Sequence, residues 1–145
     1  MFIDAIAQAQ DSLVAETPSW CRILLVEDDP SMRALLAEIL RGEGYAVDAA
    51  ADGTRAAERL FVDDALADYD LIVSDVRLPG MGGVELAAHV SRAMGPPVLL
   101  MSAFATPQLV QEGVAAGAVD VIAKPFDLNH LITVLRRLAP PDIGN

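Results

Sequence analysis

The sequence predicts an α/β fold in which five parallel strands form one sheet covered by helices on both faces. Five short apolar runs, rich in Val, Ile and Leu, alternate along the chain with five segments of helical periodicity. Strands and helices that alternate in this way form βαβ units, and right-handed crossovers place helices on both faces of the sheet. The length of 145 residues is enough for one domain with a sizeable core. The expected architecture is a three-layer, doubly wound sandwich.

Each predicted strand is a short apolar run that is bounded by polar or turn-forming residues. Such runs are typical of strands that are buried on both faces of a parallel sheet. The expected strands cover residues 22–26, 45–49, 71–75, 98–102 and 119–123.

Five helices follow these strands. Asp29 and Pro30 fit the N-cap and the first position of the first helix, and Gly42 fits its end. The scattered methionines are interpreted as core residues. The expected helices cover residues 30–41, 54–67, 84–94, 107–116 and 128–138, with residues 62–64 as a candidate interruption of the second helix.

The chain divides into an N-terminal extension (residues 1–19), a compact domain (residues 20–139) and a C-terminal tail (residues 140–145). Apolar residues in the extension follow a loose helical period that Pro18 breaks. Two interpretations of the extension stay open. It is either an amphipathic helix that packs on the domain or on a second copy, or it is disordered, because an isolated helix of this length is marginal in water.

The composition argues against several classes of partner and location. A net charge of −11 and a pI near 4.3 make nucleic acid and anionic membrane poor partners. No apolar stretch reaches the ~20 residues that span a bilayer, and the acidic N-terminus does not fit a secretory signal. Cys21 is the only cysteine, which excludes an internal disulfide and fits a reducing, cytoplasmic setting.

Charged and hydroxyl side chains stand at the ends of four predicted strands. Glu27 and Asp28 follow the first strand, Asp75 ends the third, Ser102 ends the fourth and Lys124 follows the fifth. Because the carboxyl ends of parallel strands share one edge of the sheet, these residues converge. Three carboxylates in one place repel one another unless a cation lies between them, and Mg²⁺ binds few carboxylates while it keeps several waters. We therefore expect a Mg²⁺ site.

This set of side chains suits phosphoryl transfer onto a carboxylate. Asp75 would be the nucleophile, and Ser102 and Lys124, the only lysine of the chain, would hold the phosphoryl oxygens. Considered alone, Asp75 is better explained as a residue that caps the next turn, and the other strand-end residues favour the chemical role. His89 and His130 lie on predicted helices and are interpreted as surface or packing residues.

Four motifs, in this order and spacing, resemble the receiver (REC) domain of the two-component response-regulator family. They are Val26-Glu27-Asp28-Asp29, Asp75-Val76-Arg77-Leu78-Pro79-Gly80-Met81, Ser102-Ala103 and Lys124-Pro125-Phe126. The resemblance covers residues from about 22 to 138. It implies a (βα)5 flavodoxin-like fold with the strand order 2-1-3-4-5. It also implies a cis peptide bond between Lys124 and Pro125.

The resemblance assigns roles to the site residues. Asp75 is expected to accept a phosphoryl group from a sensor histidine kinase or a histidine phosphotransfer protein. Mg²⁺ is expected to bind Asp28, Asp75 and the main-chain carbonyl of Arg77, with Glu27 acting in part through water. The chain would then be a signalling phosphoacceptor that takes part only in its own phosphotransfer and dephosphorylation, and not an enzyme.

The resemblance also implies an output surface. A downstream protein partner would bind the face made by the fourth helix, the fifth strand and the fifth helix, and the chain would be a monomer or a weak, phosphorylation-dependent dimer. Phe104 and Val121 are the expected switch residues. Val121 stands where the family usually has an aromatic residue, and Arg77 and Phe104 flank the entry for attacking water, which leaves the dephosphorylation rate open.

Two other functions stay open. One is a receiver-like interaction module that works without phosphorylation, although the intact strand-end residues argue against it. The other is an aspartate-nucleophile phosphatase of the haloacid-dehalogenase type, which needs a second Asp two residues after the nucleophile, where this sequence has Arg77. The chain is expected to be either a single-domain regulator or a receiver from a longer protein.

Overall fold

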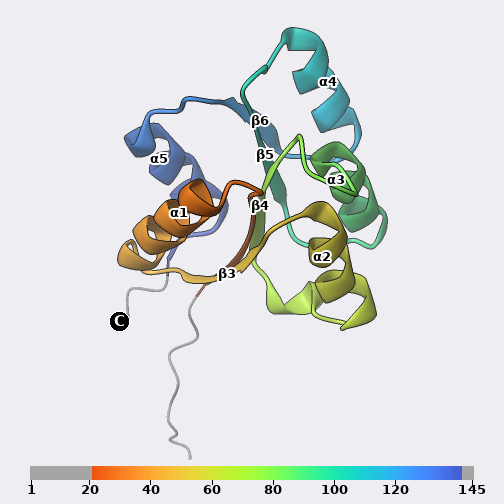
Figure 1. Ribbon diagram of the computed structural model, residues 1–145, viewed down its shortest axis with the longest axis horizontal. Helices are drawn as coiled ribbons and strands as arrows, with labels where there is room; N and C mark the ends of the chain where they lie inside the picture. The colour runs from red at the N-terminus through yellow and green to blue at the C-terminus, as the bar shows by residue number, and fades with distance from the viewer. Residues whose placement is uncertain (1–20, 142–145) are drawn as a thin grey trace, which may run out of the picture.

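A computed structural model describes residues 21–141 of the chain (Figure 1). The predicted N-terminal extension, residues 1–19, and residues 142–145 of the predicted tail lie outside the described residues. The proposed domain boundaries therefore stay a prediction. Within residues 21–141, no helix is long and apolar enough to cross a membrane.

Five parallel strands form one sheet in the order β3-β2-β4-β5-β6. Counted along the chain, this is the order 2-1-3-4-5, which confirms the predicted topology. β3 and β6 each begin one residue later than the sequence pattern indicated. The strands are β2 (Arg22–Val26), β3 (Ala46–Ala50), β4 (Leu71–Asp75), β5 (Val98–Ser102) and β6 (Asp120–Ala123).

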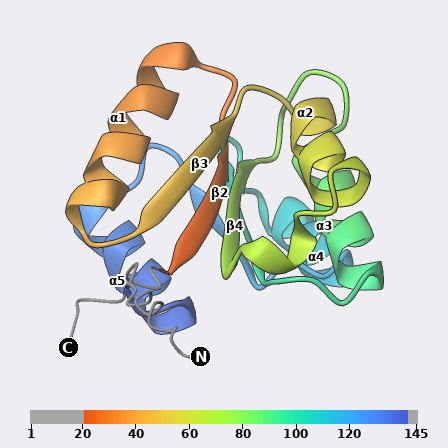
Figure 2. The same cartoon turned by 90° about the horizontal axis from the view of Figure 1, so that it is seen from below.

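Helices cover both faces of the sheet, so the predicted three layers are confirmed (Figure 2). One face carries α1 (Pro30–Gly42) and α5 (Leu128–Leu138), and the other carries α2 (Gly53–Ala57), α3 (Gly83–Arg92) and α4 (Pro107–Ala115). Side chains of a strand point alternately to the two faces, because its side-chain period is two. In β2, Ile23 and Leu25 join the core under α1 and α5, whereas Leu24 and Val26 join the core under α2 and α3.

The start of α1 follows the predicted capping pattern. The Asp29 side chain accepts a hydrogen bond from the Ser31 N–H at 3.0 Å, and Pro30 occupies the first helical position. The cap satisfies one of the backbone donors that the first turn of a helix leaves without a partner. It also fixes the direction in which the chain leaves β2, directly after Glu27 and Asp28.

The second helix is interrupted where the sequence indicated. After α2 the chain forms a π-helical turn, η1 (Glu58–Val62), and then a 3-10 turn, η2 (Leu66–Asp68). The N–H of Asp63 donates to the carbonyl of Glu58 at 2.8 Å, and Asp64 adopts a left-handed conformation with φ of 59°. A left-handed residue cannot continue a right-handed helix, so the helical run ends there.

The helix α3 is shorter than predicted. It ends at Arg92, because Met94 adopts a positive φ of 57°. The Met94 side chain is 91% exposed, so the interpretation of the methionines as core residues is wrong at this position. Met101, by contrast, is fully buried in β5.

Candidate functional site

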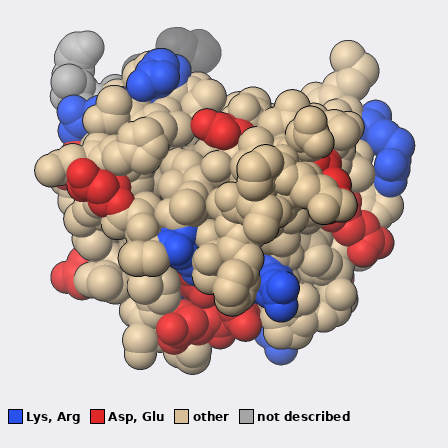
Figure 3. Space-filling model, turned by 90° about the horizontal axis from the view of Figure 1, so that it is seen from above, with Lys and Arg blue, Asp and Glu red and all other residues tan. Residues whose placement is uncertain are grey.

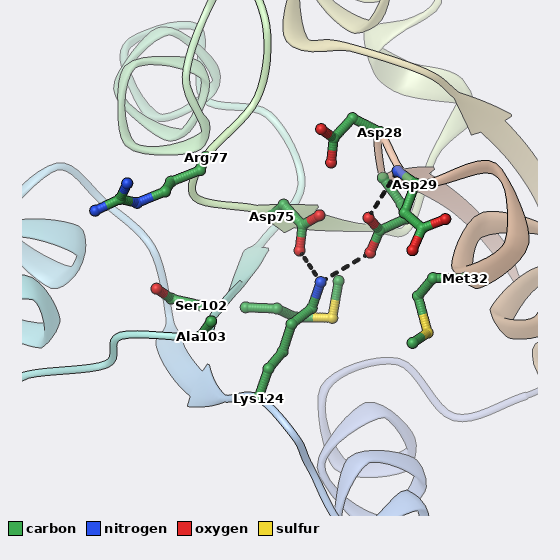
Figure 4. Close-up of a pocket in the computed structure, with 10 residues that line it drawn as sticks. Asp28, Asp29, Met32, Asp75, Arg77, Ser102, Ala103 and Lys124 are labelled. Atoms are coloured by element: carbon green, nitrogen blue, oxygen red, sulfur yellow. Dashed lines mark hydrogen bonds and ion pairs between the residues drawn. The ribbon is translucent and has the colours of Figure 1, made fainter.

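The carboxyl ends of β2, β4, β5 and β6 surround a pocket at one edge of the sheet (Figure 4). Its volume is about 310 Å³. The pocket brings together all the side chains that were predicted to hold the metal and the phosphoryl group, and it also includes Arg77. The lining residues are Glu27, Asp28, Asp29, Met32, Asp75, Arg77, Met101, Ser102, Ala103 and Lys124.

Three carboxylates converge in this pocket. Glu27, Asp28 and Asp75 each place one carboxylate oxygen within 4.8 Å of the others. Glu27 is 1% exposed and Asp75 is 6% exposed, whereas Asp28 lies at the surface. Like charges at this separation raise the free energy of the ionised state, and burial adds to that cost because the carboxylates lose hydration.

Lys124 supplies a positive charge between the two buried carboxylates. Its Nζ donates a hydrogen bond to Oε1 of Glu27 at 2.9 Å and lies 2.6 Å from Oδ1 of Asp75 (Figure 4). Its backbone N–H donates to the carbonyl of Ser102 at 2.7 Å, so β5 fixes the position at which Lys124 leaves β6. The peptide bond between Lys124 and Pro125 is cis, as the family resemblance predicted.

The three coupled groups have shifted pKa values. Burial, with the Glu27 carboxylate nearby, raises the pKa of Asp75 to about 7, although Lys124 opposes that shift. Burial also acts to raise the pKa of Glu27, but contacts with Asp75, Lys124 and the Asp29 N–H outweigh it and hold the pKa below its usual range. Burial lowers the pKa of Lys124, and the two carboxylates more than reverse this. Of the two carboxyl groups, Asp75 is therefore the one that keeps a proton more readily.

The residues fit the predicted Mg²⁺. Although Oδ1 of Asp75 pairs with the Lys124 ammonium, it has no partner in hydrogen-bonding geometry among the described residues. A buried oxygen without a hydrogen bond is costly, and a bound cation would satisfy it. The three clustered carboxylates offer oxygen donors, which hard cations such as Mg²⁺ prefer.

Ser102 lies in the pocket wall but does not point at Asp75. Its Oγ accepts a hydrogen bond from the backbone N–H of Phe104 at 3.0 Å. In Figure 4 the Ser102 hydroxyl points away from both Asp75 and Lys124. The structure thus places Ser102 where the sequence predicted, with its hydroxyl holding the turn that follows β5.

Arg77 and Phe104 lie against each other beside the pocket. The guanidinium carbon of Arg77 lies 5.3 Å from the centroid of the Phe104 ring, a cation–π contact. Phe104 is 63% exposed and does not line the pocket. Val121 lies away from the pocket as well, 8% exposed in the core under α4.

Arg33 supports the acidic loop, and the sequence interpretation missed it. Its Nη1 donates to the carbonyl of Glu27 at 2.9 Å and lies 3.5 Å from the carbonyl of Asp28. A basic residue in the first turn of α1 is unusual, because that end of the helix dipole favours acidic side chains. This unusual position of Arg33 was the sequence signal that it has a partner close by.

One face of the molecule carries both signs of charge. The face seen from above in Figure 3 shows a compact group of acidic side chains next to separate basic ones.

Comparison with known proteins shows that residues 23–136 match the response regulator receiver domain family. The transcriptional regulatory protein TcrA of Mycobacterium tuberculosis is 43% identical over 122 residues, which cover 83% of this chain and 47% of TcrA. The uncharacterized transcriptional regulatory protein YrkP of Bacillus subtilis is 38% identical over 120 residues, which cover 80% of this chain and 50% of YrkP. The chain spans about half the length of the curated relatives it matches.

Solved structures have the same fold. The chemotaxis protein CheY4 of Vibrio cholerae is 34% identical, with a TM-score of 0.71 over 81% of this chain and 98% of that chain. The response regulator TrrA of Thermotoga maritima, solved in complex with Mg(2+)-BeF, is 30% identical, with a TM-score of 0.70 over 81% of this chain and 97% of that chain.

Proposed function

Because the chain belongs to the response regulator receiver domain family, we propose that Asp75 is its phosphoacceptor and that a sensor histidine kinase or a histidine phosphotransfer protein is the donor. Phosphorylation-dependent switching is the general function of this family. One observation carries the assignment to Asp75. It is the buried carboxylate at the end of β4 whose Oδ1 lies 2.6 Å from the only lysine of the chain.

The transfer needs no general base. An ionised oxygen of Asp75 attacks the phosphorus atom, and the bond from phosphorus to the donor histidine nitrogen breaks. The imidazole leaves with the electron pair of that bond and the aspartate becomes an acyl phosphate. With a pKa of about 7, Asp75 is only partly ionised at neutral pH, and a cation in the pocket would favour the ionised form.

The proposed Mg²⁺ ligands are Asp28, Asp75 and the main-chain carbonyl of Arg77. Glu27 would act partly through water. When bound, Mg²⁺ neutralises negative charge on the carboxylates and on the transferring phosphoryl oxygens. Lys124 then exchanges its contact with Asp75 for a phosphoryl oxygen. Ser102 donates its hydroxyl to another phosphoryl oxygen after it turns toward the pocket.

The proposed output is a protein contact on the face of α4, β6 and α5. Val114 of α4 and Val119, directly before β6, are 49% and 44% exposed, which leaves apolar area for a partner near these elements. We expect a monomer or a weak dimer that forms on phosphorylation, in the cytoplasm. The chain itself would be a phosphoacceptor and not an enzyme acting on other substrates.

Incubation with acetyl phosphate and Mg²⁺, followed by intact-mass analysis, tests the assignment. We expect wild-type protein to gain one phosphoryl group that hydroxylamine removes, because hydroxylamine cleaves acyl phosphates and leaves serine phosphates intact. Asp75→Asn should gain none, since an amide is not a nucleophile here. Continuous consumption of donor without a phosphorylated form would favour the phosphatase, and absence of any uptake would favour the silent module.

A further inference from the structure

The loop that follows Asp75 is held against α2 at a point where no side chain fits. We call residues 76–82, which join β4 to α3, the acceptor loop. A Cβ atom at Gly53, the first residue of α2, would lie 1.7 Å from the carbonyl oxygen of Met81. Real Cβ contacts are not found below 3.0 Å, so only glycine permits this approach.

A second contact lies beside the first. A Cβ atom at Gly80, which has a positive φ of 76°, would lie 2.2 Å from Oγ1 of Thr54. Both contacts join the first turn of α2 to the far half of the acceptor loop. Figure 2 shows the loop between β4 and α3 passing over the start of α2.

The first residue of the acceptor loop is bonded to β5 and to the start of α3. The N–H of Val76 donates to the carbonyl of Met101 at 2.9 Å, and the N–H of Gly83 donates to the carbonyl of Val76 at 2.8 Å. A force applied at Met81 therefore displaces residues between 77 and 82. Arg77, which lines the pocket, is in that interval.

We propose that Gly53 is a positioning residue for the phosphoacceptor site, through which α2 sets the path of the acceptor loop and so the place of the Arg77 carbonyl. This inference rests on the proposed function, because it is that function that makes the Arg77 carbonyl a Mg²⁺ ligand. Gly53 touches neither metal nor phosphoryl group. It acts through the carbonyl of Met81.

Gly53→Ala tests the proposal. The new methyl group collides with backbone, so the loop has to move, and we expect Mg²⁺ affinity to fall about tenfold or more, as for other residues that orient metal ligands. Without Mg²⁺, amide chemical shifts of residues 77–82 should change as well. Gly42→Ala is the matched control, because a Cβ atom at Gly42 would meet nothing within 4 Å.

A general loss of stability must be separated from misplacement of the loop. Leu135→Ala removes a fully buried side chain of α5, far from α2 in sequence and on the other face of the sheet, so it should lower the melting temperature and leave the Mg²⁺ affinity unchanged. If Gly53→Ala does not fold, the comparison of Gly80→Ala with Gly80→Ala/Thr54→Ala tests the neighbouring contact between α2 and the loop, because the backbone strain of alanine at a positive φ is common to both variants. Removal of the Thr54 hydroxyl should then restore part of the lost Mg²⁺ affinity.

The outcomes separate this inference from the proposed function. If wild-type protein neither binds Mg²⁺ nor takes up phosphate, the proposed function is wrong. If wild-type protein does both and Gly53→Ala binds Mg²⁺ as tightly as Gly42→Ala does, the role of Gly53 is wrong. A tenfold weaker Mg²⁺ affinity in Gly53→Ala, with Leu135→Ala unchanged, supports it.

Discussion

Glu27 and Asp75 are both buried carboxylates, yet the fold moves their pKa values in opposite directions. Glu27 accepts hydrogen bonds from Lys124 and from the Asp29 N–H, which favour its charged form. Asp75 lies next to a carboxylate that is already charged, and one ammonium does not neutralise two buried anions. Without a metal, Asp75, the residue proposed to act as nucleophile, is therefore the carboxyl group that is still partly protonated near neutral pH.

This gives the metal-free protein a pH-dependent stability. An unfolded Asp titrates near pH 3.9, whereas the folded pKa of Asp75 is about 7. Between these values the folded state holds a proton that the unfolded state has lost, so this contribution to stability is full below about pH 4 and is lost as the pH rises toward 7. Asp75→Asn removes it. The free energy of unfolding of Asp75→Asn, relative to wild type, should rise across this window by at most about 1.4 kcal/mol per pH unit.

Urea unfolding without Mg²⁺ at several pH values between 4 and 8 measures the difference. Glu27 contributes in the opposite sense, because its folded pKa is lowered and its share of stability is lost as the pH falls. The comparison must therefore be made between wild type and Asp75→Asn at each pH. Parallel curves for the two proteins would contradict the elevated pKa.

The sequence could place the site residues but not orient their side chains. Asp75, Ser102 and Lys124 were predictable because each ends an apolar run, and parallel topology brings such ends together. The hydroxyl direction of Ser102 and the contact of Arg77 with Phe104 depend on how the loops fold over the sheet. No local pattern in the sequence encodes these two features.

At the scale of elements, α4 packs unusually close to β6. A Cβ atom at Gly113 of α4 would lie only 2.9 Å from Cγ2 of Val121. Val121 is 8% exposed and packs in the core under α4, so this position has no open space for a large ring. Valine also has one stiff χ1 angle, which removes the rotamer exchange that an aromatic switch residue would use.

Phosphorylation should therefore change the backbone after β5 more than the surroundings of Val121. To reach a phosphoryl oxygen, Ser102 has to give up the hydrogen bond that it accepts from the Phe104 N–H. With Mg²⁺ and beryllofluoride as a phosphoryl mimic, amide shift changes should be largest for residues 102–106 and small at Val121. Two-dimensional NMR spectra of the free and mimic-bound protein measure them.

Two variants make this result decisive. Asp75→Asn should show no response to beryllofluoride, which checks that the changes come from the acceptor site. Ser102→Ala should reduce the changes at residues 102–106. A dominant change at Val121 that persists in Ser102→Ala would show that the signal takes another route.

In the second helix, the sequence predicted the break but not the π-helical turn before it. The acidic run after Phe61 predicted a break, because Asp favours local backbone conformations that compete with the helix. The π-helical turn before that break was not predictable. Its hydrogen bond joins Glu58 to Asp63, five residues apart instead of the four of an α-helix, and no residue pattern distinguishes the two spacings. Tertiary packing of Leu60, which is 1% exposed, accompanies it.

At the scale of the whole molecule, the alternation of strands and helices was enough to predict a parallel three-layer fold. The strand order could not be predicted from this alternation, because several orders of five parallel strands satisfy it. It came from the resemblance to the receiver family, and the sheet confirms it. The hydrophobic pattern along the chain determines the layers, whereas the strand order depends on which strands pair across long sequence separations.

The whole chain carries a net charge of −11, and part of that charge is concentrated at the pocket. A ligand that binds only the folded state stabilises it by mass action. Mg²⁺ should therefore raise the melting temperature in a concentration-dependent way, worth about 2.7 kcal/mol when its concentration is 100 times its dissociation constant. Asp28→Ala should abolish this rise, since it removes a proposed ligand.

Thermal unfolding over a range of Mg²⁺ concentrations measures the effect. Asp68→Ala, which removes an exposed carboxylate from η2, should keep the full response and so controls for the loss of one negative charge. Without Mg²⁺, Asp28→Ala should be no less stable than wild type, because a carboxylate that repels Glu27 and Asp75 is gone. If Asp28→Ala still responds to Mg²⁺ as wild type does, the ion stabilises the protein from another site and the three-carboxylate assignment fails.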